Sequence, residues 1–101
     1  MNRNQLQMIQ QMQNRMVKMQ EELGQERIEG SAGGGVVKVA VNGHQEVQSI
    51  IIDKDVVDPE DVETLQDLIQ VAVNDAMKKA QELAQKKMAG VTGGIKIPGL
   101  M

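Results

Sequence analysis

The sequence predicts an α+β protein in which a long N-terminal helix, a three-stranded antiparallel meander and a long C-terminal helix follow one another (α-β-β-β-α). Apolar residues recur at helical spacing in the first two dozen positions, alternate with polar residues from 27 to 52, and return to helical spacing after the sequence DPED. The 101 residues are predicted to form a single domain, 1–101. A domain of this size buries only about two-thirds of its unfolded surface, so we expect it to associate.

The first helix is predicted over residues 1–24. Its apolar residues are separated by 3, 4, 3 and 4 positions, which is the spacing of a heptad seam, and Gly24 marks its end. The residues of this seam are Ile9, Met12, Met16, Met19 and Leu23. Because thioether side chains adapt to irregular partners, we interpret the methionines as a packing surface rather than a ligand site.

The sheet is predicted over residues 25–53. Its three strands are a weak one at 27–31, an alternating valine run at 37–42 and a β-branched run at 46–52. The dipeptide Asn42-Gly43 predicts a type I′ hairpin turn, which requires positive φ at both residues. The glycines at 33–35 stand where the first strand must turn into the second.

The second helix is predicted over residues 58–89. Asp58 is the expected N-cap and Pro59 the first helical residue, because the proline ring fixes φ at a helical value. Glu60 and Asp61 then place negative charge at the positive end of the helix dipole. The apolar line of this helix consists of Val62, Leu65, Leu68, Ile69, Ala72, Val73, Ala76, Ala80, Leu83 and Ala84.

The end of this helix departs from the apolar pattern. At about 100° per residue Lys87 projects into the middle of the apolar line, so we expect the last turns to have left the core. Residues 90–101 are predicted to form a glycine-rich tail that is either flexible or docked only by Ile95, Ile97 and Leu100.

The motifs that could carry chemistry are weak. A phosphate-binding loop opens a helix, but the glycines at 33–35 lead into a strand and no Lys-Ser/Thr pair follows them. The acidic cluster between Asp53 and Asp61 lacks the central glycine and the distant glutamate of an EF-hand loop. His44 has no second histidine or cysteine with which to share a metal, and we interpret it as a solvated turn residue. We therefore predict no catalytic site, no cofactor and no bound metal.

Composition excludes several classes of protein. The absence of cysteine excludes disulfides, thiolate metal sites and a cysteine nucleophile, and the absence of aromatic residues removes the stacking platforms that single-stranded nucleic acids require. No apolar run approaches the roughly 20 residues of a membrane span, and the amide-rich N-terminus does not resemble a signal peptide. We expect a cytoplasmic protein with no membrane partner and no small-molecule substrate.

The net charge of −3 is unevenly distributed along the chain. Residues 1–20 hold Arg3, Arg15 and Lys18 and no acidic residue, a charge of +3, whereas residues 21–76 carry −10. Residues 77–101 hold five lysines and one glutamate, a charge of +4. The basic ends predict either contacts to a polyanion or a solvated helix surface with an i, i+4 pair between Lys78 and Glu82.

The order of these features is similar to that of the YbaB/EbfC family of small bacterial nucleoid-associated proteins. The resemblance covers nearly the whole chain: the Gln/Met-rich first helix, EGSAGGGVVKVAVNG from Glu29, IDKDVVDPEDVETLQDLIQVAVNDAMKKA from Ile52, and GGIKIPGL from Gly93. It implies a homodimer that forms through the sheet and holds DNA with helices projecting like the arms of tweezers. A second copy would also cover the sheet face and the heptad seam that a single helix leaves unburied.

We therefore expect a non-enzymatic protein of the bacterial nucleoid that binds double-stranded DNA as a homodimer, largely through phosphates, with a role in nucleoid organisation and gene regulation. The predicted DNA-binding residues are Arg3, Arg15, Lys18, Lys78, Lys79, Lys86 and Lys87. The alternative is a protein-interaction adaptor without DNA binding, in which the methionine-rich seam docks partner helices.

Overall fold

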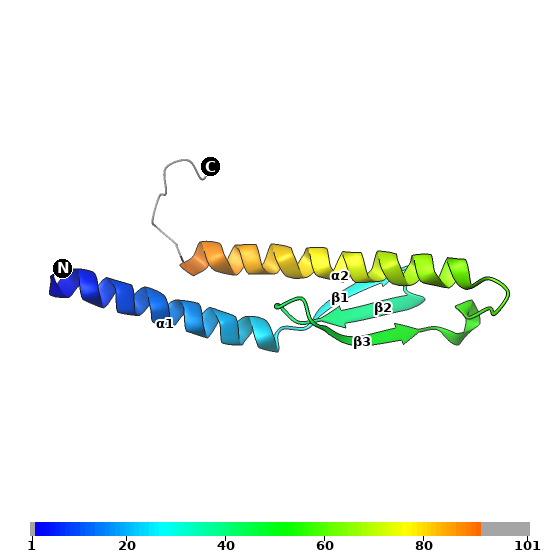
Figure 1. The fold of residues 1–101 in the computed structure, drawn as a ribbon, viewed down its shortest axis with the longest axis horizontal. Coiled ribbons are helices and arrows are strands. Elements are labelled where there is room, and N and C mark those ends of the chain that lie inside the picture. The colour runs from blue at the N-terminus through cyan, green and yellow to red at the C-terminus, as the bar shows by residue number, and fades with distance from the viewer. Residues whose placement is uncertain (1, 92–101) are drawn as a thin grey trace, which may run out of the picture.

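The computed structural model describes residues 2–91, and its elements follow the predicted α-β-β-β-α order (Figure 1). They are α1 (Arg3–Gln25), β1 (Ile28–Ala32), β2 (Val37–Val41), β3 (Val47–Ile52), a 3₁₀ turn η1 (Lys54–Val56) and α2 (Val62–Val91). The molecule is elongated, with extents of 69 × 27 × 17 Å. Most of the tail predicted at 90–101 lies outside the described residues, and Gly90 and Val91 belong to α2.

The two helices meet the sheet in different ways. Along much of its length α2 lies against the sheet, whereas α1 runs away from the sheet along the long axis of the molecule (Figure 1). The N-cap of α1 is Asn2, whose side-chain oxygen accepts the Gln5 backbone N–H at 2.9 Å. With 23 residues, α1 is about 35 Å long at 1.5 Å per residue.

The sheet is the predicted antiparallel meander in the order β1-β2-β3. Gly33, Gly34 and Gly35 form the turn between β1 and β2 with φ values of 63°, 74° and 98°. These left-handed backbone conformations strain any residue with a Cβ atom, so three consecutive glycines are needed here. The glycines therefore serve the bend, and the turn leads into a strand rather than a helix.

The hairpin between β2 and β3 forms where predicted, but its predicted turn type is wrong. Neither Asn42 nor Gly43 has positive φ; that conformation belongs to Gln45, at 62°. The Gln45 N–H donates to the Asn42 carbonyl and the Asn42 N–H to the Glu46 carbonyl, at 3.1 and 3.0 Å. This is a three-residue loop built on a turn followed by a left-handed residue, not a two-residue type I′ turn. The Asn42 side chain stabilises it by accepting the N–H groups of His44 and Glu46.

The start of α2 also differs from the prediction. The helix begins at Val62, and the cap is Asp61, whose carboxylate accepts the Thr64 N–H at 3.3 Å and the Thr64 hydroxyl at 2.6 Å. Asp58 and Pro59 belong to a preceding turn, in which the Asp58 side chain accepts the Glu60 N–H at 2.9 Å. The prediction of Asp58 as the N-cap was wrong because both aspartates offer a capping carboxylate and the earlier one is used by the turn.

The core lies between α2 and the first two strands. Val37, Val39 and Val41 of β2 are fully buried, as are three alanines one turn apart on α2, Ala72, Ala76 and Ala80. A Cβ atom on Gly30 of β1 would collide with the backbone of Ala72 and Ala76. The absence of a side chain at this strand position therefore lets the helix backbone approach the sheet closely.

The two edge strands of the sheet, β1 and β3, differ in whether their outer backbone groups are hydrogen-bonded. Along the outer edge of β1, the Ser31 N–H donates to the Asp75 carboxylate at 3.1 Å, and the Lys79 ammonium donates to the Glu29 carbonyl at 3.2 Å. Side chains of α2 thus close this edge. Strand β3 instead has exposed apolar side chains at Val47, Ile50, Ile51 and Ile52, from 36% to 57% accessible. An open edge with apolar side chains is a surface on which another strand can pair.

Candidate nucleic-acid interface

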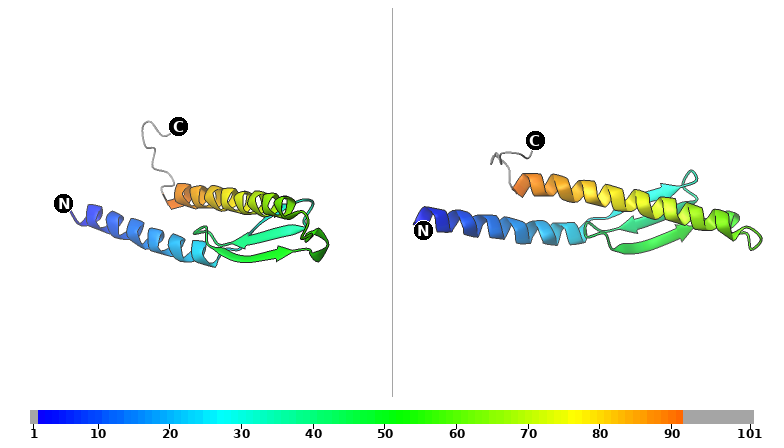
Figure 2. Two further views of the ribbon diagram at one scale, coloured as in Figure 1. Left: turned by 45° about the vertical axis from the view of Figure 1, so that its right-hand side comes forward. Right: turned by 45° about the horizontal axis from the view of Figure 1, so that its top comes forward.

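Beyond the sheet, α1 and the end of α2 run side by side as a two-helix projection, which we call the arm (Figure 2). Met19 and Leu23 of α1 pack against Leu83 and Ala84 of α2 and are buried. This short contact is the only part of the heptad seam that is buried among residues 2–91. Ile9 and Met16 are 41% and 42% exposed. The last turns of α2 have left the sheet, as predicted, but they pack on α1.

α1 is fastened to the sheet at the hairpin turn. The Gly43 N–H donates to the Leu23 carbonyl at 2.7 Å. The Nε2 atom of His44 lies 2.9 Å from the Gln20 carbonyl, which can only accept, so this nitrogen carries the hydrogen. His44 is exposed, as a solvated turn residue would be, but its ring also joins the turn to the last turns of α1. These contacts fix where the arm points.

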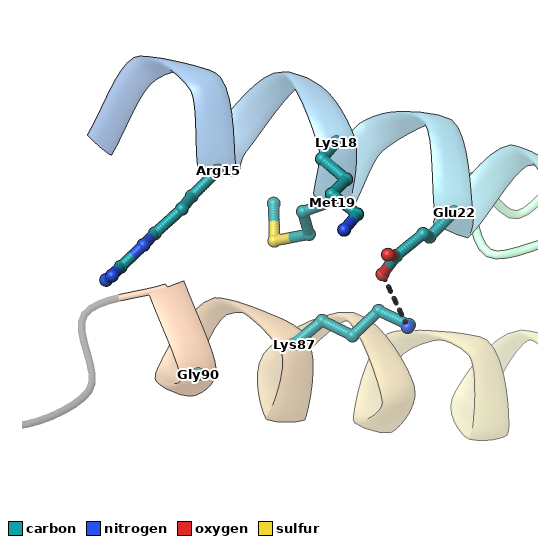
Figure 3. Close-up of a pocket in the computed structure, with 6 residues that line it drawn as sticks. All are labelled: Arg15, Lys18, Met19, Glu22, Lys87 and Gly90. Atoms are coloured by element: carbon teal, nitrogen blue, oxygen red, sulfur yellow. Dashed lines mark hydrogen bonds and ion pairs between the residues drawn. The ribbon is translucent and has the colours of Figure 1, made fainter. Parts of the chain in front are cut away.

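A hollow between the two helices of the arm collects basic side chains. It is lined by Arg15, Lys18, Met19, Glu22, Lys87 and Gly90, and we call it the cationic hollow (Figure 3). Arg15 extends from α1 toward the end of α2, and Lys87 extends from α2 toward Glu22. Three positive side chains and one negative side chain therefore face a space that is open to solvent and large enough for a small anion.

Lys87 links α2 to α1 by ion pairs, although its sequence position places it in the apolar line of α2. Its Nζ lies 3.3 Å from the Glu22 carboxylate and 3.6 Å from that of Glu26. The Lys87 side chain is only 23% exposed. The lysine is tolerated on this face because it meets acidic residues of α1 there rather than the apolar core.

The other predicted DNA-binding residues are not all gathered at the hollow. Arg3 lies at the far end of α1 and Lys86 beside Lys87; both are exposed, and neither forms an ion pair within residues 2–91. Lys78 and Lys79 lie over the sheet, where Lys79 pairs with Asp75 at 3.2 Å. The ion pair expected between Lys78 and Glu82 does not form in the described part of the chain; Asp75 and Lys79 make the equivalent i, i+4 pair.

The Asp75 carboxylate of α2 contacts both the Ser31 backbone N–H of β1 and the Lys79 ammonium. The backbone hydrogen bond from Ser31 lowers its pKa below the ordinary value, and the hydrogen bond and charge of Lys79 lower it further. The neighbouring charge of Lys78 acts in the same direction. Asp75 and Lys79 thus satisfy the backbone of β1, which leaves Lys79 less available to a ligand than Lys86.

Charge is unevenly distributed along the long axis, although the arm holds acidic residues such as Glu21, Glu22 and Glu82 as well as basic ones. The basic residues of the arm lie at one end, and the opposite end, around η1 and the start of α2, carries an acidic cluster (Figure 1). This cluster consists of Asp53, Asp55, Asp58, Glu60, Asp61, Glu63 and Asp67.

No group of three or more metal-ligating side chains comes together within residues 2–91. Neither described helix is long and apolar enough to cross a membrane.

Sequence reasoning missed the residues that organise the arm. Glu22 and Glu26 were counted only as part of an acidic middle segment, yet they hold Lys87. The sequence did contain a signal for this contact. Glu22 and Glu26 are four positions apart and so lie on one face of α1, and Lys87 is a lone lysine in the apolar line of α2. Opposite charges on these two faces meet when the helices pack antiparallel. Gly43 was assigned to a turn conformation, whereas its role is close contact with Leu23.

Known proteins resemble this chain in both sequence and fold. Residues 1–95 match the YbaB/EbfC DNA-binding family. A nucleoid-associated protein of Chloroflexus aurantiacus is 60% identical over 97 residues, covering 95% of this chain and 97% of the relative. One from Syntrophobacter fumaroxidans is 54% identical over 97 residues, covering 96% and 88%. The crystal structure of an uncharacterized Helicobacter pylori protein has a TM-score of 0.80 at 26% identity, covering 92% of this chain and 99% of that one. On the family match over residues 1–95 and the identity to these relatives, the chain belongs to the YbaB/EbfC DNA-binding family.

Proposed function

We propose that this protein is a nucleoid-associated protein of the bacterial cytoplasm that binds double-stranded DNA as a homodimer, largely through backbone phosphates. The observation that carries the proposal is the separation of charge: a basic arm at one end and an acidic cluster at the other, on a chain whose net charge is −3. A uniformly negative surface would repel DNA, but local fields decide association because salt screens charges over about 8–10 Å.

The arm offers contacts suited to a phosphate backbone. Arg15 and Lys18 carry charge that no acidic residue among 2–91 neutralises by an ion pair, and Arg3 and Lys86 extend the basic surface along the arm. Such contacts are made to phosphates rather than base edges, so binding should depend little on DNA sequence and strongly on salt. The acidic cluster would keep the opposite end of the molecule away from DNA.

The open edge of β3 supports the homodimer. Asp53 donates its N–H to the Val36 carbonyl at 2.8 Å, and hydrogen-bonding direction alternates along an antiparallel strand. Ile50 and Ile52 therefore turn their backbone N–H and carbonyl groups away from β2. Pairing of two β3 strands would satisfy these groups and bury the exposed isoleucines of both copies. Two arms would then project from one central sheet.

A salt titration of DNA binding tests the proposal. Wild-type protein is titrated into a random-sequence duplex in gel-shift or fluorescence-anisotropy experiments at several salt concentrations. We expect log Kobs to fall linearly with log salt, by about 0.9 for each phosphate contact. The double variant Arg15→Gln/Lys18→Gln should bind more weakly and show a shallower slope.

The matched control removes the same charge elsewhere. Lys38→Gln/Lys54→Gln takes two exposed lysines from the sheet and from η1, away from the arm. We expect its DNA affinity to stay close to that of wild type. Salt-independent binding, or an equal loss in both double variants, would show that the arm is not the DNA-binding surface.

The adaptor alternative also has an observation in its favour. Leu6, Met8 and Val17 on α1 are 49% to 59% exposed, and Gln5, Met8, Ile9 and Met12 line a second, mostly apolar hollow. Exposed methionines suit a surface that packs against varied helices. A stoichiometric protein partner that survives nuclease treatment, together with no measurable affinity for duplex DNA, would favour the adaptor.

A further inference from the structure

We propose that the cationic hollow is the binding site of a single DNA backbone phosphate, and that Glu22 and Glu26 restrain this site by holding Lys87. The inference rests on the proposed function and adds to it a defined site and a pair of residues that weaken binding. In the free protein Lys87 is paired with the two glutamates; with DNA bound, its ammonium group turns to the phosphate beside Arg15 and Lys18.

The geometry of the arm places the required groups together. Arg15 and Lys18 come from neighbouring turns of α1 and Lys87 from the last turns of α2, so the three positive groups approach the hollow from two sides (Figure 3). Gly90 lines the same space, and a Cβ atom added there would meet no other group of residues 2–91 within 4 Å. Among residues 2–91, nothing covers the hollow at Gly90, and we expect a phosphate to enter there.

Glu22 is an anion inside a site for anions. The side chains that line the hollow carry three positive charges and one negative charge, and the negative one is the carboxylate that holds the Lys87 Nζ at 3.3 Å. A carboxylate in this position repels a phosphate, and it also occupies the Lys87 ammonium group that would otherwise donate to the phosphate. Glu26, 3.6 Å from the same nitrogen, adds to the second effect.

The transfer of the Lys87 ammonium from the two glutamates to a phosphate should cost little free energy. The Glu22 and Glu26 side chains are 47% and 39% exposed, and ion pairs between exposed groups contribute little to stability. A lysine carries three donors on a flexible stem, so its ammonium can leave one oxygen and reach another without movement of the helix. The restraint should lower DNA affinity without blocking binding.

The test compares Glu22→Gln with a control of equal charge. Glu63→Gln removes one negative charge at the start of α2, among the acidic residues far from the hollow. We expect Glu22→Gln to bind a random-sequence duplex on the order of threefold more tightly than Glu63→Gln at low salt, with a salt slope steeper by about 0.9 for each arm that engages. Glu26→Gln should show a smaller gain, because it lies farther from Lys87 and does not line the hollow.

A double-mutant cycle identifies the role of Lys87. If Glu22 acts by holding this lysine, most of the gain from Glu22→Gln disappears in a Lys87→Gln background. A gain that persists in full there, or equal affinities for Glu22→Gln and Glu63→Gln, would overturn the proposal while leaving DNA binding by the arm intact. A wild-type protein that binds no DNA at low salt would instead overturn the proposed function and this site with it. Circular dichroism melting of each variant reports whether the arm remains folded.

Discussion

Gly43 and Leu23 are in closer contact than any side chain at position 43 would allow. The Gly43 N–H donates to the Leu23 carbonyl at 2.7 Å, and a Cβ atom on Gly43 would lie 2.6 Å from that same oxygen. The contact joins the hairpin turn of the sheet to the last turn of α1. The direction of the arm therefore depends on the absence of one methyl group.

We predict that Gly43→Ala destabilises the protein by about 1–3 kcal/mol, since a methyl group forced into a closed contact displaces backbone. Urea unfolding at a fixed protein concentration measures this. Gly90→Ala is the matched control: it also adds a methyl group, but into open space on a helix, where alanine is the better helix former. Equal stability of Gly43→Ala and wild type would show that the junction is loose.

The second prediction concerns acid stability. The Ser31 hydrogen bond and Lys79 hold the pKa of Asp75 below its ordinary value of 3.8. A depressed pKa in the folded state stabilises the protein above the unfolded-state value and loses that effect as the pH falls through the folded-state value. Wild type should be more stable than Asp75→Asn above pH 3.8, and the difference should shrink below it.

Urea unfolding of both proteins between about pH 2 and pH 6 measures this difference. The asparagine keeps a side-chain acceptor for the Ser31 N–H, so the comparison isolates the charge of Asp75. A difference in unfolding free energy that does not change with pH would contradict the assignment.

The third prediction separates two lysines of α2 that sequence reasoning placed in one group. Lys86 is exposed and forms no ion pair with residues 2–91, whereas the Lys79 Nζ is engaged by Asp75 and the Glu29 carbonyl. Lys86→Gln should weaken DNA binding and reduce the salt slope with little effect on stability. Lys79→Gln should mainly lower the unfolding free energy, and only slightly, because its ion pair with Asp75 is exposed. The reverse order in DNA affinity would contradict the division.

The fourth prediction concerns the open strand. Ile50→Lys places a charge on the exposed edge of β3 and should yield a monomer at micromolar concentration, measured by sedimentation equilibrium. Val71→Lys is the control, because Val71 is also apolar and exposed, at 57%, but lies on α2 away from β3. A dimer that persists in Ile50→Lys, or a monomeric wild type, would exclude pairing through this edge.

Periodicity predicted the order of the elements well, because helical and strand spacing differ clearly in this chain. The three glycines at 33–35 were also interpreted correctly as a bend, since glycine is the residue that adopts consecutive positive φ values without strain. The sequence pattern could not decide which of two nearby, chemically equivalent residues takes a given structural role. Asp58 and Asp61 both offer a capping carboxylate, and only the path of the chain decides that Asp61 caps α2.

The site was harder to predict than the fold, because it depends on how two helices lie against each other. Counting charge identified Arg15, Lys18 and Lys87 as basic, but the meeting of Lys87 with Glu22 joins residues 65 positions apart. Asn42-Gly43 is a similar case: tertiary contact with Leu23 outweighed the local preference for a type I′ turn. In both cases a contact between distant segments decided the outcome.

The closed edge of β1 bears on how large an assembly can become. Two copies joined through β3 would make one continuous sheet whose two outer strands are both β1, each with its Ser31 N–H and Glu29 carbonyl already bonded to α2. A third copy would find no vacant strand to add to within the described residues. Growth should therefore stop at a pair, which protects the protein against forming filaments through its sheets.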